Sequence, residues 1–158
     1  MIVVSDTSPL NYLVLIEQED ILRKLFGRVV IPQTVFNELN ATGASAKVRD
    51  WTNNLPAWIE VRQTNLIADA SLDILDAGER EAILLTQELS ADLLLVDDKQ
   101  ARQAALALHL SITGTIGVLD QAARRNLIDL RNVIDELQKT NFHISEDLIR
   151  ELFKADEN

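Results

Sequence analysis

Residues 2–13 read IVVSDTSPLNYL, and this stretch joins a short apolar run to a polar turn and a second apolar run. The first run stops abruptly at Ser5 and Asp6, as a buried strand does at its end. Asp6 has two interpretations: it caps the helix that begins near Pro9, or it is one of several carboxylates gathered around a metal ion. The choice depends on where the other carboxylates lie in the chain.

Further short apolar runs predict the other strands of a sheet. They lie at residues 29–31, 58–61, 93–96 and, as a weaker fifth, 111–113. The runs at 29–31 and 93–96, like the first, consist almost entirely of Val, Ile or Leu without alternation, which is typical of strands covered on both faces of a parallel sheet. Helical patterns fill the intervals, at residues 10–16, 21–26, 33–39, 78–89, 101–108, 116–125, 133–139 and 148–153. Strands that alternate with helices predict an α/β fold with right-handed crossovers.

The bulk composition suits one globular domain. The chain has 158 residues, no cysteine and a formal charge of −10. We expect no signal peptide, no membrane span of ~20 apolar residues and a cytoplasmic location. The negative charge argues against a protein that coats nucleic acid non-specifically, because phosphate binding needs cationic surface. It does not exclude a nuclease, because clustered carboxylates add negative charge that divalent ions offset locally.

A second pair of acids follows another predicted strand. Residues 91–102 read ADLLLVDDKQAR, so Asp97 and Asp98 come directly after an apolar run. Ligands of open α/β sheets bind beyond the carboxyl ends of the strands. If the strands at 2–5 and 93–96 are neighbours, Asp6 and this pair converge. As an alternative, one of the two caps the helix that starts at Lys99.

Two more acids lie on predicted helices. Glu38 sits on the flank of the apolar face of residues 33–39, and it is either a pocket acid or an ordinary solvated one. Glu79 falls inside the apolar arc of residues 78–89, where an unpaired carboxylate is costly, although it also complements the helix dipole. Together the four acidic sites offer oxygen ligands of the kind that Mg²⁺ or Mn²⁺ prefers. Such a centre suits in-line hydrolysis of a phosphodiester.

The ordered motifs resemble those of the PIN-domain family. They are SDTSPL, VFNEL, LDAGEREAI, LLLVDDKQAR and TGTIGVLDQA, and they run in order from residue 2 to about residue 137. In particular the chain resembles small prokaryotic PIN proteins of the VapC toxin type. The resemblance implies a three-layer α/β/α sandwich with a parallel sheet of four or five strands in the order 3-2-1-4-5. It implies a single PIN-like domain over residues 1–158, with a C-terminal helical segment at about 129–155.

The same resemblance implies an activity and its residues. The chain would be a Mg²⁺- or Mn²⁺-dependent endoribonuclease, the toxin of a toxin–antitoxin pair, with an RNA substrate, a small antitoxin protein as partner and a homodimeric state. Asp6 and either Asp97 or Asp98 would hold the principal metal. Glu38 and Glu79 would complete the pocket, directly or through waters.

Five further residues are candidates for substrate binding. Ser8 would hold a metal-bound water or belong to a helix cap. Thr113 and Thr115 would line the rim or form a plain turn and cap. Lys99 and Arg102 would steer a phosphate backbone or lie in solvent.

Two departures from the family pattern bear on metal affinity. The third acid, often Asp, is Glu79 here, and Val96 stands where Thr or Ser is usual if Asp98 is the last acid. A rival hypothesis, which the net charge of −10 and the absence of an obvious basic stripe support, is a catalytically silent PIN fold that acts as a binding or regulatory module. We expect structural roles for His109 and His143.

Overall fold

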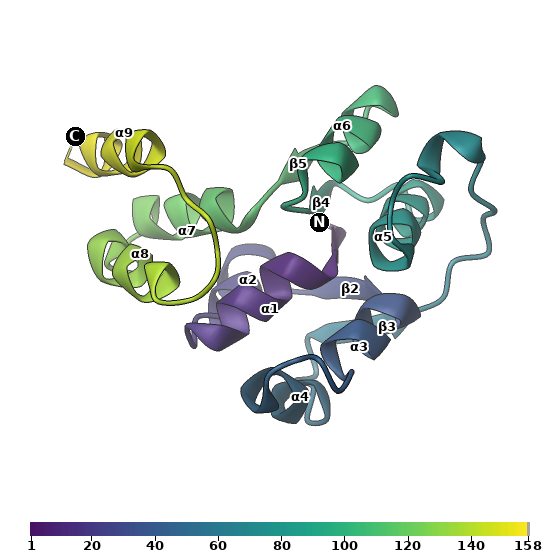
Figure 1. The fold of residues 1–158 in the computed structure, drawn as a ribbon, viewed down its shortest axis with the longest axis horizontal. Coiled ribbons are helices and arrows are strands. Elements are labelled where there is room, and N and C mark those ends of the chain that lie inside the picture. The colour runs from purple at the N-terminus through teal and green to yellow at the C-terminus, as the bar shows by residue number, and fades with distance from the viewer. Residues whose placement is uncertain (158) are drawn as a thin grey trace.

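The computed structural model describes residues 1–157 and has five parallel strands in the order β3-β2-β1-β4-β5 (Figure 1). The strands are β1 (Val3–Ser5), β2 (Val29–Pro32), β3 (Ile59–Arg62), β4 (Leu93–Leu95) and β5 (Ile112–Thr113). The predicted fold class and strand order are therefore confirmed, including the short fifth strand.

Both faces of the sheet are apolar, which explains the continuous hydrophobic runs. Val3 and Leu95 point into one core, whereas Val4 and Leu94 point into the other. Successive side chains of a strand alternate between faces, so a strand buried on both sides needs an apolar residue at every position. Helices cover each face and make the three layers of the sandwich.

The helices fall into two groups around the sheet. They are α1 (Thr7–Leu15), α2 (Asp20–Phe26), α3 (Gln33–Leu39), α4 (Ala46–Thr52), α5 (Ala77–Glu88), α6 (Lys99–Ala107), α7 (Thr115–Arg124), α8 (Leu130–Gln138) and α9 (Glu146–Glu157), with a 3₁₀ turn η1 (Ala70–Leu72). Helices α5 and α6 and the turn η1 pack against the Val4 face. Helices α1 to α4 and α7 to α9 contribute to the core on the Val3 face. Among the described residues, no helix is long and apolar enough to cross a membrane.

The connection between α3 and α4 ends at Ser45. Residues 40–45 form the turn, and Ser45 caps α4 by accepting a hydrogen bond from the backbone N–H of Val48 at 3.2 Å. Ser is among the preferred residues at this position because its oxygen satisfies a free helix N–H.

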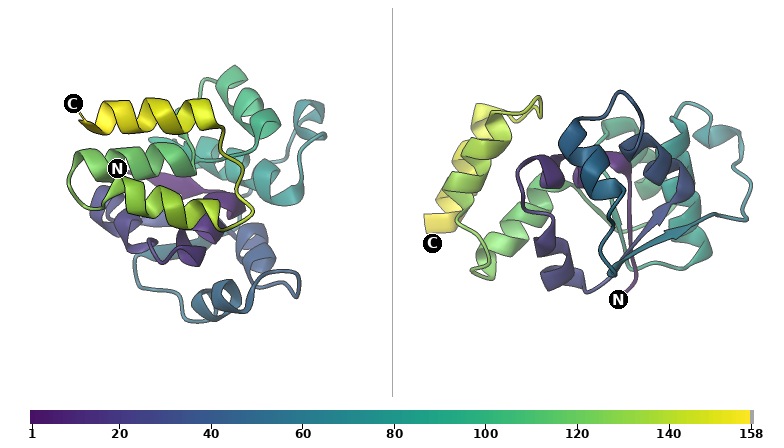
Figure 2. Two further views of the ribbon diagram at one scale, coloured as in Figure 1. Left: turned by 60° about the vertical axis from the view of Figure 1, so that its left-hand side comes forward. Right: turned by 90° about the horizontal axis from the view of Figure 1, so that it is seen from below.

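The last two helices lie outside the sandwich and pack on α7 (Figure 2). We call the connection between them, residues 140–145, the strap. At the end of the strap, the Ser145 hydroxyl oxygen accepts a hydrogen bond from the backbone N–H of Leu148 at 3.2 Å, as Ser45 does from Val48. The strap brings the chain back to the carboxyl end of β5. Phe142 and His143 there line one cavity together with Thr113 and Gly114.

Candidate active site

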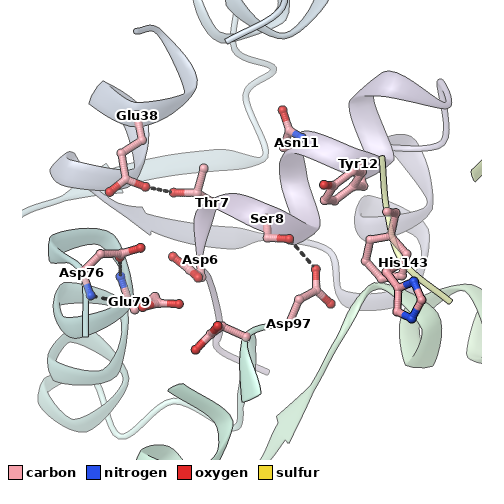
Figure 3. Close-up of a pocket in the computed structure, with 12 residues that line it drawn as sticks. Asp6, Thr7, Ser8, Asn11, Tyr12, Glu38, Asp76, Glu79, Asp97 and His143 are labelled. Atoms are coloured by element: carbon pink, nitrogen blue, oxygen red, sulfur yellow. Dashed lines mark hydrogen bonds between the residues drawn. The ribbon is translucent and has the colours of Figure 1, made fainter. Parts of the chain in front are cut away.

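An open cavity of about 560 Å³ lies beyond the carboxyl ends of β1 and β4 (Figure 3). The register places Ser5 opposite Leu95, so the residues after both strands are neighbours. The backbone N–H of Asp6 extends this pairing by donating to the Leu95 carbonyl at 2.9 Å. The lining comprises Asp6, Thr7, Ser8, Asn11, Tyr12, Glu38, Asp76, Glu79, Asp97, Asp98, Phe142 and His143. All five predicted acids therefore meet in one cavity.

Asp6 is buried and its charge is poorly compensated. It occupies the position before α1, but within residues 1–157 its side chain makes no capping hydrogen bond, and its Oδ1 atom is buried without a hydrogen-bond partner. Burial, together with the negative charges of Glu79, Asp76 and Glu38, raises the pKa of Asp6 to about 8, against the lowering effect of a backbone hydrogen bond from Thr7. The helix-cap interpretation of this side chain is therefore wrong.

Glu38 reaches the cavity from α3 and is fixed by two donors. The Thr7 hydroxyl donates to its Oε2 atom, and the backbone N–H of Gly78 donates to its Oε1 atom at 3.1 Å. A Cβ atom at Gly78 would lie 2.6 Å from Oε2, so a larger residue here would push the Glu38 carboxylate out of its position. The interpretation of Glu38 as an ordinary solvated acid is wrong, since it is half-buried and lines the pocket.

Glu79 lies in the first turn of α5 and forms a capping box with Asp76. Asp76 accepts from the Glu79 N–H at 2.9 Å, and Glu79 accepts from the Asp76 N–H at 3.1 Å. Desolvation raises the pKa of Glu79 to about 7, with further contributions from the nearby carboxylates of Asp76 and Asp98 and a lowering contribution from the backbone bond. Glu79 thus belongs both to a helix cap and to the acidic cluster.

Asp97 and Asp98 have different local roles. Asp98 caps α6 by accepting from the Ala101 N–H at 3.0 Å, which settles which of the pair is the cap. Asp97 accepts from the Ser8 hydroxyl and from the hydroxyl and N–H of Thr115, each at 2.7 Å. Ser8 and Thr115 are therefore brought to the site as positioning residues for Asp97. A Cβ atom at Gly114 would lie 2.7 Å from Asp97 Oδ1, so this glycine also makes room for an acid.

Four predicted substrate-binding residues lie outside the lining of the acidic cavity: Thr113, Thr115, Lys99 and Arg102. Thr115 is fully buried, so it does not line the rim. Arg102 donates to the Val96 carbonyl at 2.9 Å and lines, with Thr113, a neighbouring cavity of about 350 Å³. Lys99 is exposed at the start of α6. Within residues 1–157, the lining of the acidic cavity contains no Lys or Arg, so His143 is its one side chain that can carry positive charge.

Six lining residues were not predicted as site residues: Thr7, Asn11, Tyr12, Asp76, Phe142 and His143. Asp76 had a local signal, because Asp76 and Glu79 have the spacing of a capping box. Asn11 and Tyr12 read as ordinary helix positions, and Phe142 and His143 lie far from the motifs in sequence. We expected a structural role for His143, whereas the structure places it in the pocket lining.

Comparison with known proteins places the chain in a family. Residues 2–157 match the family described as DUF3368: PIN domain. The chain belongs to this PIN-domain family. Its fold is similar to that of the PilT N-terminus domain protein SSO1118 from the hyperthermophilic archaeon Sulfolobus solfataricus P2, with a TM-score of 0.52 and 19% identity over 92% of this chain and 100% of that one. No curated protein matches the chain. PIN domains are generally nucleases that use divalent metal ions.

The acids of this PIN domain are of the chemical type that binds a divalent ion, but the described side chains are not arranged closely enough to form a complete metal site. Among the described residues, no group of three or more acidic or histidine side chains has the spacing of a metal centre. The donors are oxygen atoms throughout, as Mg²⁺ and Mn²⁺ prefer. Asp6 Oδ1 is the clearest candidate ligand, because it is a buried acceptor that lacks a protein partner in residues 1–157.

Proposed function

We propose that this PIN domain is a Mg²⁺- or Mn²⁺-dependent endoribonuclease. The observation that carries the proposal is the buried, unpartnered Oδ1 atom of Asp6 within a pocket of six carboxylates. Burying a charge without a partner is costly, so the arrangement is favourable only when a proton or a cation compensates it. A divalent ion would be held by Asp6 with Asp97 or Asp98, and when bound it would supply an activated water and stabilise charge on phosphorus.

The protein's own groups divide the remaining work. Ser8 and Thr115 orient Asp97 through hydroxyl hydrogen bonds. Glu38, held by Thr7 and Gly78, keeps a carboxylate at the rim in a fixed position. Glu79, with a pKa of about 7, can accept or release a proton near neutral pH, so it suits proton transfer with the attacking water.

The test is cleavage of a single-stranded oligoribonucleotide with Mn²⁺, using wild-type protein and the Asp6→Asn variant. We expect wild-type cleavage that depends on Mn²⁺ and a loss of at least about a thousandfold in the variant, because a metal ligand is removed. Asp135→Asn is the matched control, since Asp135 is exposed on α8. Equal rates for wild type and Asp6→Asn would refute the proposal, and a DNA oligonucleotide of the same sequence measures the preference for RNA.

The rival function, a silent binding module, is favoured by one observation. Both oxygens of Asp97 already accept hydrogen bonds from Ser8 and Thr115, which leaves this acid partly satisfied without a metal. A wild-type protein that binds RNA but leaves it intact with either Mg²⁺ or Mn²⁺ would establish this function instead.

We extend the proposal to the toxin of a toxin–antitoxin pair and to a homodimer, on the support of the motif resemblance. Induced expression of the chain should arrest growth, and co-expression of a small DNA-binding protein from the adjacent reading frame should relieve the arrest. Sedimentation of the purified chain tests the dimer.

A further inference from the structure

We propose that the strap and Tyr12 form a nucleobase-stacking subsite for single-stranded RNA beside the cleavage site. This inference rests on the nuclease proposed above and adds how that site recognises its substrate. It starts from the composition of the pocket, whose two sides differ. Figure 3 shows Glu38, Asp76 and Glu79 on one side of the Ser8–Asp97 pair, and Tyr12 and His143 on the other.

The rings of the subsite pack partly against the core and also line the cavity. Tyr12 and Phe142 make an edge-to-face contact, with ring centroids 4.9 Å apart and planes at 79°. Such a contact covers at most one face of one ring, and it leaves the other faces to other partners. Both residues are half-buried and both line the 560 Å³ cavity, and Phe142 also borders the neighbouring cavity of about 350 Å³.

Hydrogen bonds tie the strap to helices α1 and α8. The Tyr12 hydroxyl donates to Asn141 Oδ1 at 2.8 Å. The Phe142 N–H donates to the Thr140 hydroxyl oxygen at 3.1 Å, and that hydroxyl donates to the Leu137 carbonyl at 2.5 Å at the end of α8. A ring that is held in position loses little conformational entropy when a base stacks on it.

The charge of the pocket makes uncharged contacts valuable for substrate binding. The described lining contains six carboxylates and neither Lys nor Arg, so it repels a phosphate backbone unless cations compensate. Base stacking on an aromatic side chain adds affinity without charge and accepts any base, because every base has a π-face. Ser8 and Asp97 lie between Tyr12 and the group formed by Glu38, Asp76 and Glu79. A base stacked on Tyr12 would therefore lie next to a phosphate bound at the acidic side of the pocket.

The test compares two phenylalanines from the same end of the chain. Phe142→Leu keeps an apolar side chain but removes the ring, and Phe142→Trp keeps a stacking surface. Phe153→Leu is the matched control, because Phe153 is also half-buried but its ring contacts Arg131 on the outer helices. We expect Phe142→Leu to raise KM for a single-stranded oligoribonucleotide about tenfold or more with little change in kcat. Phe142→Trp should restore KM, and Phe153→Leu should leave it unchanged.

A second substrate separates stacking from packing. In an oligoribonucleotide with one abasic nucleotide beside the cleaved bond, wild type and Phe142→Leu should have the same KM. Equal KM values of wild type and Phe142→Leu for the intact substrate, or an equal loss in Phe153→Leu, would overturn the subsite.

If the wild type cleaves no RNA with Mn²⁺, the nuclease proposal fails. Fluorescence anisotropy with the same oligonucleotides in Mn²⁺ then tests the stacking subsite independently of cleavage. Weaker binding by Phe142→Leu than by wild type and Phe153→Leu then supports it, and equal or undetectable binding refutes it.

Discussion

The two ends of the pocket are stabilised in opposite ways. At the acidic end (Asp6, Glu38, Asp76 and Glu79), carboxylates crowd one another, and the pKa values of Asp6 and Glu79 are raised to about 8 and about 7. At the strap end, a ring pair and a tyrosine hydrogen bond join helix α1 to the strap. The acidic end therefore opposes folding at high pH until a cation binds, whereas the strap end favours folding at every pH near neutrality. Active sites commonly cost stability in this way.

The largest expected effect on stability is at Asp6. Its pKa is about 8 in the folded protein and 3.8 as the unperturbed value, so the folded state holds an extra proton between these limits. The wild-type free energy of unfolding should fall as pH rises from about 4 to about 8. In Asp6→Asn, the share of this fall that comes from ionising Asp6 should be absent. At pH 8 with EDTA, the variant should be more stable than the wild type by about 5 kcal/mol. Urea unfolding at pH 5 and pH 8 measures this.

Asp135→Asn is the control for that measurement, because its carboxylate is exposed. A wild-type protein whose stability does not fall between pH 5 and pH 8 would show that the acidic end is not strained, and the contrast between the two ends would disappear.

The next effect concerns the glycines that make room for acids. Gly114→Ala would place a Cβ atom 2.7 Å from Asp97 Oδ1 and 3.2 Å from the Val96 carbonyl, and Gly78→Ala would place one 2.6 Å from Glu38 Oε2. Displacing a site group by about 1 Å can lower a rate about a hundredfold, so we expect losses of that order in kcat/KM for RNA cleavage. Gly43→Ala is the control, because its Cβ atom meets open space. Wild-type rates in Gly114→Ala would show that the position of Asp97 is unimportant.

Metal affinity should depend on pH at the acidic end. Asp6 and Glu79 must lose protons before their oxygens can bind a cation, and their pKa values lie near or above neutrality. We expect Mn²⁺ to bind about tenfold more weakly at pH 7 than at pH 8. Calorimetry in two buffers of different ionisation enthalpy measures both the affinity and the protons released. Binding without proton release would exclude Asp6 as a ligand.

The smallest expected change is in the free energy of unfolding when the strap end is altered. Tyr12→Phe removes the hydrogen bond to Asn141 and keeps the ring, so the free energy of unfolding should fall by about 1 kcal/mol. The pKa of Tyr12 is raised above its usual value of 10.0 by burial and by Asp97, so the loss should be the same at pH 5 and pH 8. Urea unfolding at both values tests this, and a loss that changes with pH or with Mn²⁺ would show that the two ends are coupled.

The sequence alone predicted the strands of the sheet and the acids that follow them. Continuous apolar runs are a local signal of a doubly covered strand, and an acid directly after such a run is visible without any structure. Asp6, Glu38, Glu79, Asp97 and Asp98 all line the cavity as expected. The strand order rested on family resemblance, since local patterns do not say which strands pair.

Other features depended on contacts between distant segments, and only the tertiary structure decided them. It showed that Asp98 caps α6 while Asp97 is held by Ser8, a partner 89 positions away. It also brought Asn141 to Tyr12 across 129 positions, which makes the strap a wall of the pocket. Periodicity and capping act over a few residues and can be read from the sequence. The convergence of charges and rings follows from sheet order and helix packing, which depend on the whole chain.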